Sequence, residues 1–296
     1  MDQLSQLSDA LAAHVEASSR SVVRVEGRQR LPSTGIVFSA DGLIVTADHS
    51  VRRDENIHVG LPDGRSVPAS LLGRDPTTDL ALVKAEAADL APARFAPAGG
   101  LRVGQLVLAL GRPGDGVQAT LGVISALGDA WHTPAGGELD RYVQTDVVMY
   151  PGFSGGPLVD ANGAVVGLNS SALLRGVSLT VPTGTIQRVA DTLRQHGRIR
   201  RGYLGVGAQP VRLPVGLGEQ YGGVGLLLVS VEPGSPAEQG GLHLGDVLLA
   251  VDGQRVQDLD DLLALLAGER VGKPVTVQLL RGGQVSEVTV VVGERS

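Results

Sequence analysis

The sequence predicts a mainly β protein of two domains, in which a β sandwich or barrel comes first and a small α+β module follows. The 296 residues are enough for about two domains of ~150 residues. Short β-rich runs separated by turn dipeptides such as Asp41-Gly42 and Asn162-Gly163 continue to about Pro182. With 43% hydrophobic and 19% charged residues, both domains can bury a core, which excludes bulk disorder.

The first domain is predicted to be framed by two helices. Four apolar residues recur at helical spacing near the start, which predicts an N-terminal helical segment over 1–20. A second helix is expected over 185–196, with Gly197 able to end it, and it closes a domain that spans 21–198. The strands predicted between them are 21–25, 35–38, 43–46, 57–59, 80–83, 106–109, 117–125, 141–145, 157–159 and 165–168.

The second domain is expected over 202–296, after a short basic connection. The region rich in proline and glycine near 210–225 is predicted to be a loop. A helix from about Leu259 to Leu266 is expected among the strands. These strands are 225–231, 246–251, 274–280 and 285–292.

Composition excludes several classes of function. Twenty-five Lys+Arg against 31 Asp+Glu give a net charge of −6, and no basic block is present, so nucleic acid is not an expected partner. The absence of cysteine excludes disulfides, zinc-thiolate sites and thiol catalysis. The histidines lack the spacing of metal ligands, so neither a metal nor a cofactor is expected.

No transmembrane segment is predicted, because no run reaches the ~18 apolar residues that span a bilayer. The first twenty residues also lack the cationic start and apolar run of a secretory signal. A full-length chain is therefore expected in the cytoplasm. An extracytoplasmic protein whose export segment has been removed is the alternative.

Ser154 is the strongest candidate for a catalytic residue. It lies in Pro151-Gly152-Phe153-Ser154-Gly155-Gly156-Pro157-Leu158, where glycine permits strained dihedral angles around an exposed nucleophile. The backbone N–H groups of Gly152 and Ser154 could then form an oxyanion hole. Taken alone, the same run could be a glycine-rich turn that contains a serine by chance.

A serine hydroxyl needs a base and an orienting carboxylate. Of the six histidines, His49 is the best base, because it follows a buried-looking strand from which its ring can face a cleft. The others are predicted in helices, a strand, a loop (His132) or the second domain, and a lone histidine is more often an ordinary packed or solvated ring. Asp79 directly precedes an apolar strand, whereas Asp75 precedes proline and fits a turn or capping role.

The order His49, Asp79, Ser154 is that of chymotrypsin-like double β-barrels. Thr46-Ala47-Asp48-His49-Ser50-Val51, Asp79-Leu80-Ala81-Leu82-Val83-Lys84 and the Ser154 run together resemble the motifs of the HtrA/Deg family of trypsin-like serine proteases. This resemblance implies a chymotrypsin-like double β-barrel followed by a PDZ domain. It also implies an ATP-independent endopeptidase that acts in protein quality control on unfolded or damaged polypeptides.

The sequence departs from the family pattern in three places. Phe153 stands where the family has asparagine, and Tyr150 adds a second aromatic, so a stiffer or differently posed loop is expected. The segment 169–177 is shorter than in the family, and its Leu173 and Leu174 predict a modest apolar specificity pocket. The family commonly forms trimers through N-terminal aromatics, but the first aromatic here is Phe38, which leaves a homo-oligomer open.

The second domain resembles a PDZ domain. By that resemblance Tyr203, Leu204, Gly205 and Val206 form the loop and sheet edge that capture a peptide C-terminus. Of the leucines of the helix at 259–266, one or two are expected to meet the ligand while most are core. A structural domain without a ligand is the alternative. For the whole chain, the alternative to a protease is a catalytically silent peptide-binding or chaperone-like protein, in which the Phe153 loop keeps the oxyanion hole collapsed.

Overall fold

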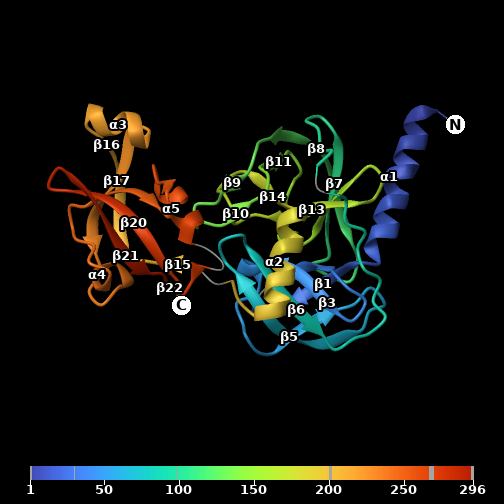
Figure 1. Cartoon of the computed structure of the whole chain (residues 1–296). Helices are drawn as coiled ribbons and strands as arrows, with labels where there is room; N and C mark the ends of the chain where they lie inside the picture. The colour runs from blue at the N-terminus through green and yellow to red at the C-terminus, as the bar shows by residue number, and fades with distance from the viewer. Residues whose placement is uncertain (1, 30, 98, 200–201, 267–269, 295–296) are drawn as a thin grey trace. The chain divides into compact units, whose positions relative to one another are not determined.

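The computed structural model divides the chain into two compact units, Met1–Ile199 and Arg200–Ser296 (Figure 1). It describes residues 2–29, 31–97, 99–199, 202–266 and 270–294. The basic connection expected between the domains includes residues 200 and 201, which lie outside the described residues.

The first unit begins with a closed six-stranded barrel in the order β1-β2-β3-β6-β5-β4. Its strands are β1 Val22–Glu26, β2 Ser33–Val37, β3 Leu43–Ala47, β4 Ile57–Gly60, β5 Ser66–Asp75 and β6 Leu80–Ala85. Alternate residues of β3 serve two cores: Ile44 fills the barrel, whereas Leu43 and Val45 join a core shared with the second barrel. Burial on both faces explains why β3 and β6 are continuous apolar runs without the alternation of a half-exposed strand.

A second closed barrel follows in the order β11-β14-β13-β12-β7-β8. Its strands are β7 Leu106–Gly111, β8 Gln118–Leu127, β11 Val143–Thr145, β12 Pro157–Asp160, β13 Val165–Ser170 and β14 Ser178–Pro182. A small antiparallel pair, β9 Trp131–His132 and β10 Glu138–Leu139, lies between β8 and β11 in the chain. The loop predicted around His132 is therefore wrong at that residue, which pairs with Glu138 across the chain.

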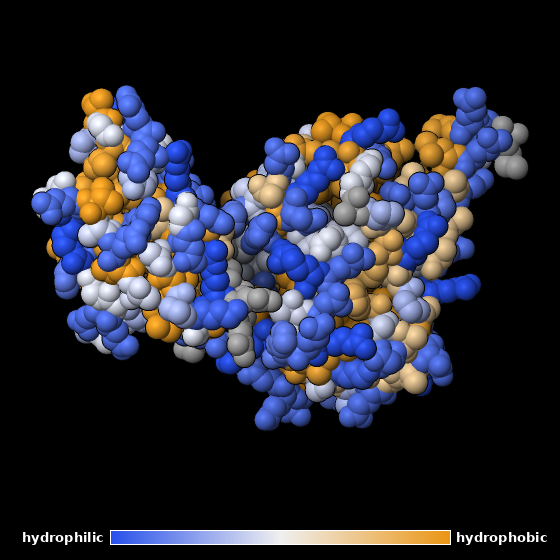
Figure 2. Space-filling model, viewed as in Figure 1, coloured by the Kyte–Doolittle hydropathy of each residue, from blue (hydrophilic) through white to orange (hydrophobic). Residues whose placement is uncertain are grey.

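Both helices of the first unit form where their periodicity predicts them. The helix α2 (Thr183–His196) contacts β5 and β6 of one barrel and β13 and β14 of the other, and Gly197 ends it at φ +70°. The helix α1 (Gln3–Ser19) buries no residue completely, and Leu4 is 71% exposed. Figure 2 accordingly shows apolar surface on α1. Among the described residues, no helix is both long and apolar enough to cross a membrane.

The second unit is a sheet in the order β16-β17-β18-β20-β21, with β19 paired to β18. Its strands are β15 Gly202–Tyr203, β16 Val206–Arg212, β17 Val224–Val231, β18 Val247–Val251, β19 Gln254–Arg255, β20 Pro274–Arg281, β21 Gln284–Val291 and β22 Gly293–Glu294. The helices are α3 Val215–Tyr221, α4 Pro236–Gln239 and α5 Leu259–Leu266, of which α5 matches the predicted bounds.

The loop predicted over 210–225 is wrong. β16 continues to Arg212 and α3 follows, because Pro214 precedes the first helical turn, where a proline needs no N–H, and Gly222 ends the helix at φ +82°. Proline and glycine here mark the two ends of a short helix. Composition alone did not distinguish that pattern from a loop.

Candidate active site

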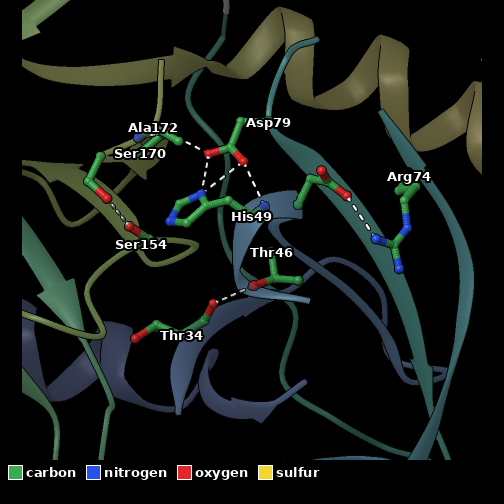
Figure 3. Close-up of polar contacts among 10 residues, drawn as sticks. Thr34, Thr46, His49, Arg74, Asp79, Ser154, Ser170 and Ala172 are labelled. Atoms are coloured by element: carbon green, nitrogen blue, oxygen red, sulfur yellow. Dashed lines mark hydrogen bonds and ion pairs between the residues drawn. The ribbon is translucent and has the colours of Figure 1, made fainter. Parts of the chain in front are cut away.

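The two barrels contribute different parts of one cavity of about 730 Å³. His49 lies in the short 3₁₀ turn η1 (Asp48–Ser50) directly after β3 of the first barrel. Ser154 lies in the turn before β12 of the second barrel, and both residues line the cavity. In Figure 3 the ring of His49 lies between Asp79 and Ser154. Residues that are far apart in the chain are thus brought to one site.

Asp79 holds the ring of His49 in a defined orientation. Its carboxylate oxygens both lie 2.9 Å from Nδ1 of His49, and Oδ1 also accepts the backbone N–H of His49 at 2.9 Å. Ser170 Oγ donates to Oδ2 at 2.5 Å. An ionised carboxylate can only accept hydrogen bonds, so Nδ1 of His49 carries the ring proton. Nε2 therefore keeps its lone pair and can accept a proton.

The backbone conformation at Asp79 sets the position of its side chain. Its φ is +56°, a left-handed conformation that aspartate tolerates better than most residues, and its side chain is 6% exposed. The apolar strand that follows Asp79 predicts a half-buried carboxylate, and the structure buries it further. Asp75 instead accepts hydrogen bonds from Thr77 and Thr78 within its own turn, as expected from the proline that follows it.

Ser154 does not contact His49 through a hydrogen bond in this structure. Its Oγ lies 3.0 Å from Oγ of Ser171, and within the described part of the chain this is the only hydrogen bond of the Ser154 side chain. In sites that pair a serine with a histidine, this contact often forms only when substrate binds.

The turn before Ser154 leaves two backbone N–H groups without an acceptor. Gly152 has φ +92°, and its carbonyl accepts Oγ1–H of Thr34 at 2.7 Å, while Phe153 N–H donates to Tyr150 O at 3.0 Å. Within the described residues, the N–H groups of Gly152 and Ser154 donate no hydrogen bond. Both amides are therefore available to an oxygen bound in the cavity.

Phe153 anchors this turn from the protein interior. Its ring is fully buried in the core of the second barrel, and a Cβ on Gly111 would lie 2.5 Å from its Cδ1, so the packing is tight. Tyr150 contacts it edge to face, with ring centroids 5.8 Å apart. The departure from the family residue thus places an aromatic side chain in the core, away from the cavity.

The predicted apolar pocket of Leu173 and Leu174 is wrong. Leu173 is buried in the core shared by the two barrels and Leu174 packs against that core, so neither lines the cavity. The cavity is lined there by Met149, Tyr150 and Pro151, which precede the turn of Gly152 and Ser154. The segment 169–177 contributes Ser171 to the cavity, whereas its leucines pack inward.

Asp48 introduces a buried charge beside His49. Its Oδ1 is buried without a hydrogen-bond partner among the described residues, and Arg74 Nη1 lies 3.6 Å away. Burial raises the pKa of the Asp48 carboxyl above its ordinary value, and the charge of Arg74 opposes that rise. Burial thus favours the protonated carboxyl of Asp48, whereas Arg74 favours the ionised one.

The loop from Tyr203 to Val206 lies at the edge of the second unit's sheet. Tyr203 ends β15, Val206 begins the edge strand β16, and α5 packs beside β16. The carbonyls of Leu204 and Gly205 accept Ala237 N–H at 2.9 Å and Glu232 N–H at 2.8 Å. Within the described residues, the N–H groups of Leu204 and Gly205 donate to no acceptor.

The helix α5 buries two of its leucines completely. Leu262 and Leu266 are fully buried in the core of the second unit, whereas Leu263 and Leu265 are half-buried. An amphipathic helix beside an edge strand is the arrangement that accepts an added peptide strand.

Comparison with known proteins gives matches over both units. A trypsin-like peptidase domain family matches residues 33–168, and a PDZ domain family matches residues 202–292. Among solved structures, the HtrA-type protease AlgW with a tripeptide matches with a TM-score of 0.78 at 32% identity, over 96% of this chain and 97% of that one. The serine endoprotease from Yersinia pestis matches with a TM-score of 0.80 at 30% identity, over 96% of this chain and 98% of that one.

The chain belongs to the HtrA/Deg family. The predicted chymotrypsin-like double β-barrel followed by a PDZ domain is confirmed. A curated relative, "Probable periplasmic serine endoprotease DegP-like" of Halomonas elongata, is 38% identical over 278 residues, which cover 91% of this chain and 57% of that protein. A relative of the same name from Chlamydia trachomatis is 36% identical over 284 residues, or 93% of this chain and 56% of that protein. The chain thus spans just over half the length of these relatives.

The expected cytoplasmic location is wrong, because these HtrA/Deg relatives are named periplasmic proteins. The expectation rested on the character of the first twenty residues, and the relatives' names overturn it.

Two polar side chains that support this HtrA/Deg site were missed by sequence reasoning. Ser170 donates to Asp79 from the end of β13, and Thr34 holds the Gly152 carbonyl while accepting Arg112 N–H at 2.8 Å. The sequence feature that could have indicated Ser170 is the pair of polar residues, Asn169 and Ser170, that ends the buried strand β13. Thr34 carried no such indication, because it lies inside a buried strand.

Proposed function

We propose that this chain is a serine endopeptidase that hydrolyses peptide bonds in unfolded or damaged proteins through His49, Asp79 and Ser154. One observation carries the proposal: His49, oriented by Asp79 at 2.9 Å, shares a cavity with Ser154 and with the turn whose Gly152 and Ser154 amides lack acceptors. The HtrA/Deg relatives, named serine endoproteases, support it.

In the proposed reaction, Nε2 of His49 takes the proton of Ser154 Oγ as Oγ bonds the substrate carbonyl carbon. The carbonyl π electrons move onto its oxygen, which the N–H groups of Gly152 and Ser154 stabilise, each by roughly 3 kcal/mol. The C–N bond then breaks, and His49 gives the proton to the leaving amine. Water repeats these steps on the acyl-enzyme and releases the acid and free Ser154.

The alternative is a silent peptide-binding or chaperone-like protein with a collapsed oxyanion hole. Such a collapse would occupy the Gly152 or Ser154 N–H group with a protein acceptor. Neither amide has one within the described residues, and Phe153 is buried away from the cavity. These observations favour the enzyme.

A fluorophosphonate probe tests the proposal, because it reacts only with an activated serine. We expect stoichiometric labelling of Ser154 in the full chain and none in Ser154→Ala. Ser171→Ala is the matched control, since its hydroxyl lies 3.0 Å from that of Ser154, and it should still take up the label on Ser154. No labelling and no casein cleavage, even with C-terminal peptides added, would support the silent protein.

The PDZ domain is proposed to bind peptides through their C-termini. The open amides of Leu204 and Gly205 beside the edge strand β16 suit a carboxylate and an added strand. Titration with one peptide bearing a free or an amidated C-terminus tests this, and only the free acid should bind. The sequence leaves a homo-oligomer open, and sedimentation of the chain would check it.

A further inference from the structure

Three arginines line the same cavity as the proposed catalytic residues. Arg28 precedes β2, whereas Arg52 and Arg53 follow η1, only a few residues after His49. The described lining contains no aspartate or glutamate. A chain with a net charge of −6 therefore presents three cationic side chains at its proposed site of cleavage.

These arginines are not engaged in the structure's ion pairs. Other arginines of the first unit are paired, such as Arg24 with Glu26 and Arg74 with Asp54. No ion pair joins Arg28, Arg52 or Arg53 to any carboxylate among the described residues. Their guanidinium groups can therefore meet an anionic ligand without first breaking an internal pair.

Backbone hydrogen bonds hold the segment that carries Arg52 and Arg53. The N–H groups of Arg52 and Arg53 both donate to Gly27 O, at 2.9 and 3.1 Å, which ties the segment after η1 to the end of β1. Arg28 lies next to Gly27 and its Nε donates to Leu31 O at 2.6 Å. The cationic groups thus stand on two connected segments at one part of the cavity wall.

Two of the arginines follow the turn that carries His49, the residue proposed to give its proton to the leaving amine. The acyl half of a substrate is held by Ser154 and the amides of its turn, and the opposite half leaves with the proton from His49. Arg52 and Arg53 extend from the His49 turn, whereas the wall near the oxyanion turn is formed by Met149, Tyr150 and Pro151. Residues after the scissile bond should therefore meet the arginines.

We propose that Arg28, Arg52 and Arg53 make the enzyme select polypeptides with acidic side chains in the first few positions after the cleaved bond. This inference rests on the proposed endopeptidase function and adds its substrate class. Guanidinium groups bind carboxylates with paired hydrogen bonds, and charges lining a cleft also raise the rate of encounter with substrates of opposite sign.

The test uses matched, internally quenched peptides and the full chain. The bond cleaved in casein is mapped first, and peptides around it carry two Asp, two Gln or two Lys residues after that bond. We expect kcat/KM to be about threefold to tenfold higher for Asp than for Gln, and lower still for Lys. The advantage should shrink as NaCl rises from about 0.05 to about 0.5 M.

The double variant Arg52→Gln/Arg53→Gln should lose most of the preference for Asp, because it keeps the backbone contacts and removes two charges. Arg65→Gln is the control: Arg65 pairs with Asp63 outside the cavity, and this variant should keep the preference. Any of three results would overturn the inference. The first is an equal kcat/KM for the Asp and Gln peptides, and the second is a preference for Asp before the cleaved bond. The third is a preference for Asp after the bond that survives in the double variant.

Failure of the inference can be told from failure of the proposed function. If the fluorophosphonate labels Ser154 and casein is cleaved but no acidic preference exists, only the selection by arginine is wrong. If neither labelling nor cleavage occurs, the proposed function is wrong and the inference falls with it.

Discussion

Replacing Phe153 by the asparagine that the HtrA/Deg motif carries at this position should destabilise the first unit. The ring is fully buried against Gly111 with no room for even a Cβ there. Losing its burial costs about 1.5–3 kcal/mol. An amide left in the same apolar core without a partner costs about 1–3 kcal/mol more. The two costs add to about 2.5–6 kcal/mol. Aromatic truncations in protein cores cost about 3–5 kcal/mol, and we expect a loss in that range.

The assay can observe the first unit alone. Trp131 is the only tryptophan of the chain and lies in β9, so its fluorescence follows the unfolding of this unit. A loss of 3–5 kcal/mol should lower the unfolding midpoint by about 6–20 °C. Fluorophosphonate labelling of Ser154 should slow as well, because Phe153 anchors the turn that carries the backbone N–H of Ser154.

Tyr150→Asn is the matched control, the same chemical change at a ring that is 54% exposed. It should cost less than about 1 kcal/mol, since most of that ring already contacts solvent. If Phe153→Asn unfolds within about 2 °C of the unsubstituted chain, the reasoning from burial is refuted.

Three further predictions concern charged groups. Asp79→Asn should lower kcat on casein about 10⁴-fold without unfolding the protein, because an amide no longer selects the right tautomer of His49. Burial raises the pKa of Asp48, so stability that is present at low pH is lost as pH rises through that pKa. Asp48→Asn should therefore raise the unfolding midpoint at pH 8. In melts followed by Trp131 fluorescence, this gain should vanish near pH ~4. Burial alone would raise the pKa of Asp246, but hydrogen bonds from Arg281 at 2.7 Å and from the His243 N–H outweigh it and hold that pKa below its ordinary value. The second unit should therefore lose stability as pH falls below ~4, and Asp246→Asn should remove that dependence in calorimetry.

The sequence predicted the elements whose causes are local. The helix α2 follows from apolar spacing and a glycine at its end, and the turn at Asp75 from an aspartate before proline. Where local causes compete, prediction failed: Pro214 and Gly222 bound a helix in a region that composition assigned to a loop.

The walls of the site could not be predicted in the same way. Leu173 and Leu174 are apolar wherever they lie, and only the packing of both barrels decides that they enter the core and not the cavity. The same holds for Phe153, whose burial depends on the space left beside Gly111.

The chain by itself determined the identity and order of the three proposed catalytic residues, because nucleophile, base and acid each need a particular side chain in a particular local backbone. Only the tertiary structure decided that Ser170 supports Asp79, that Thr34 holds the Gly152 carbonyl, and that arginines from two segments line the same cavity as His49. Hydrogen bonds and cavity walls join residues from strands far apart in the chain, and such distances exist only once both barrels have closed.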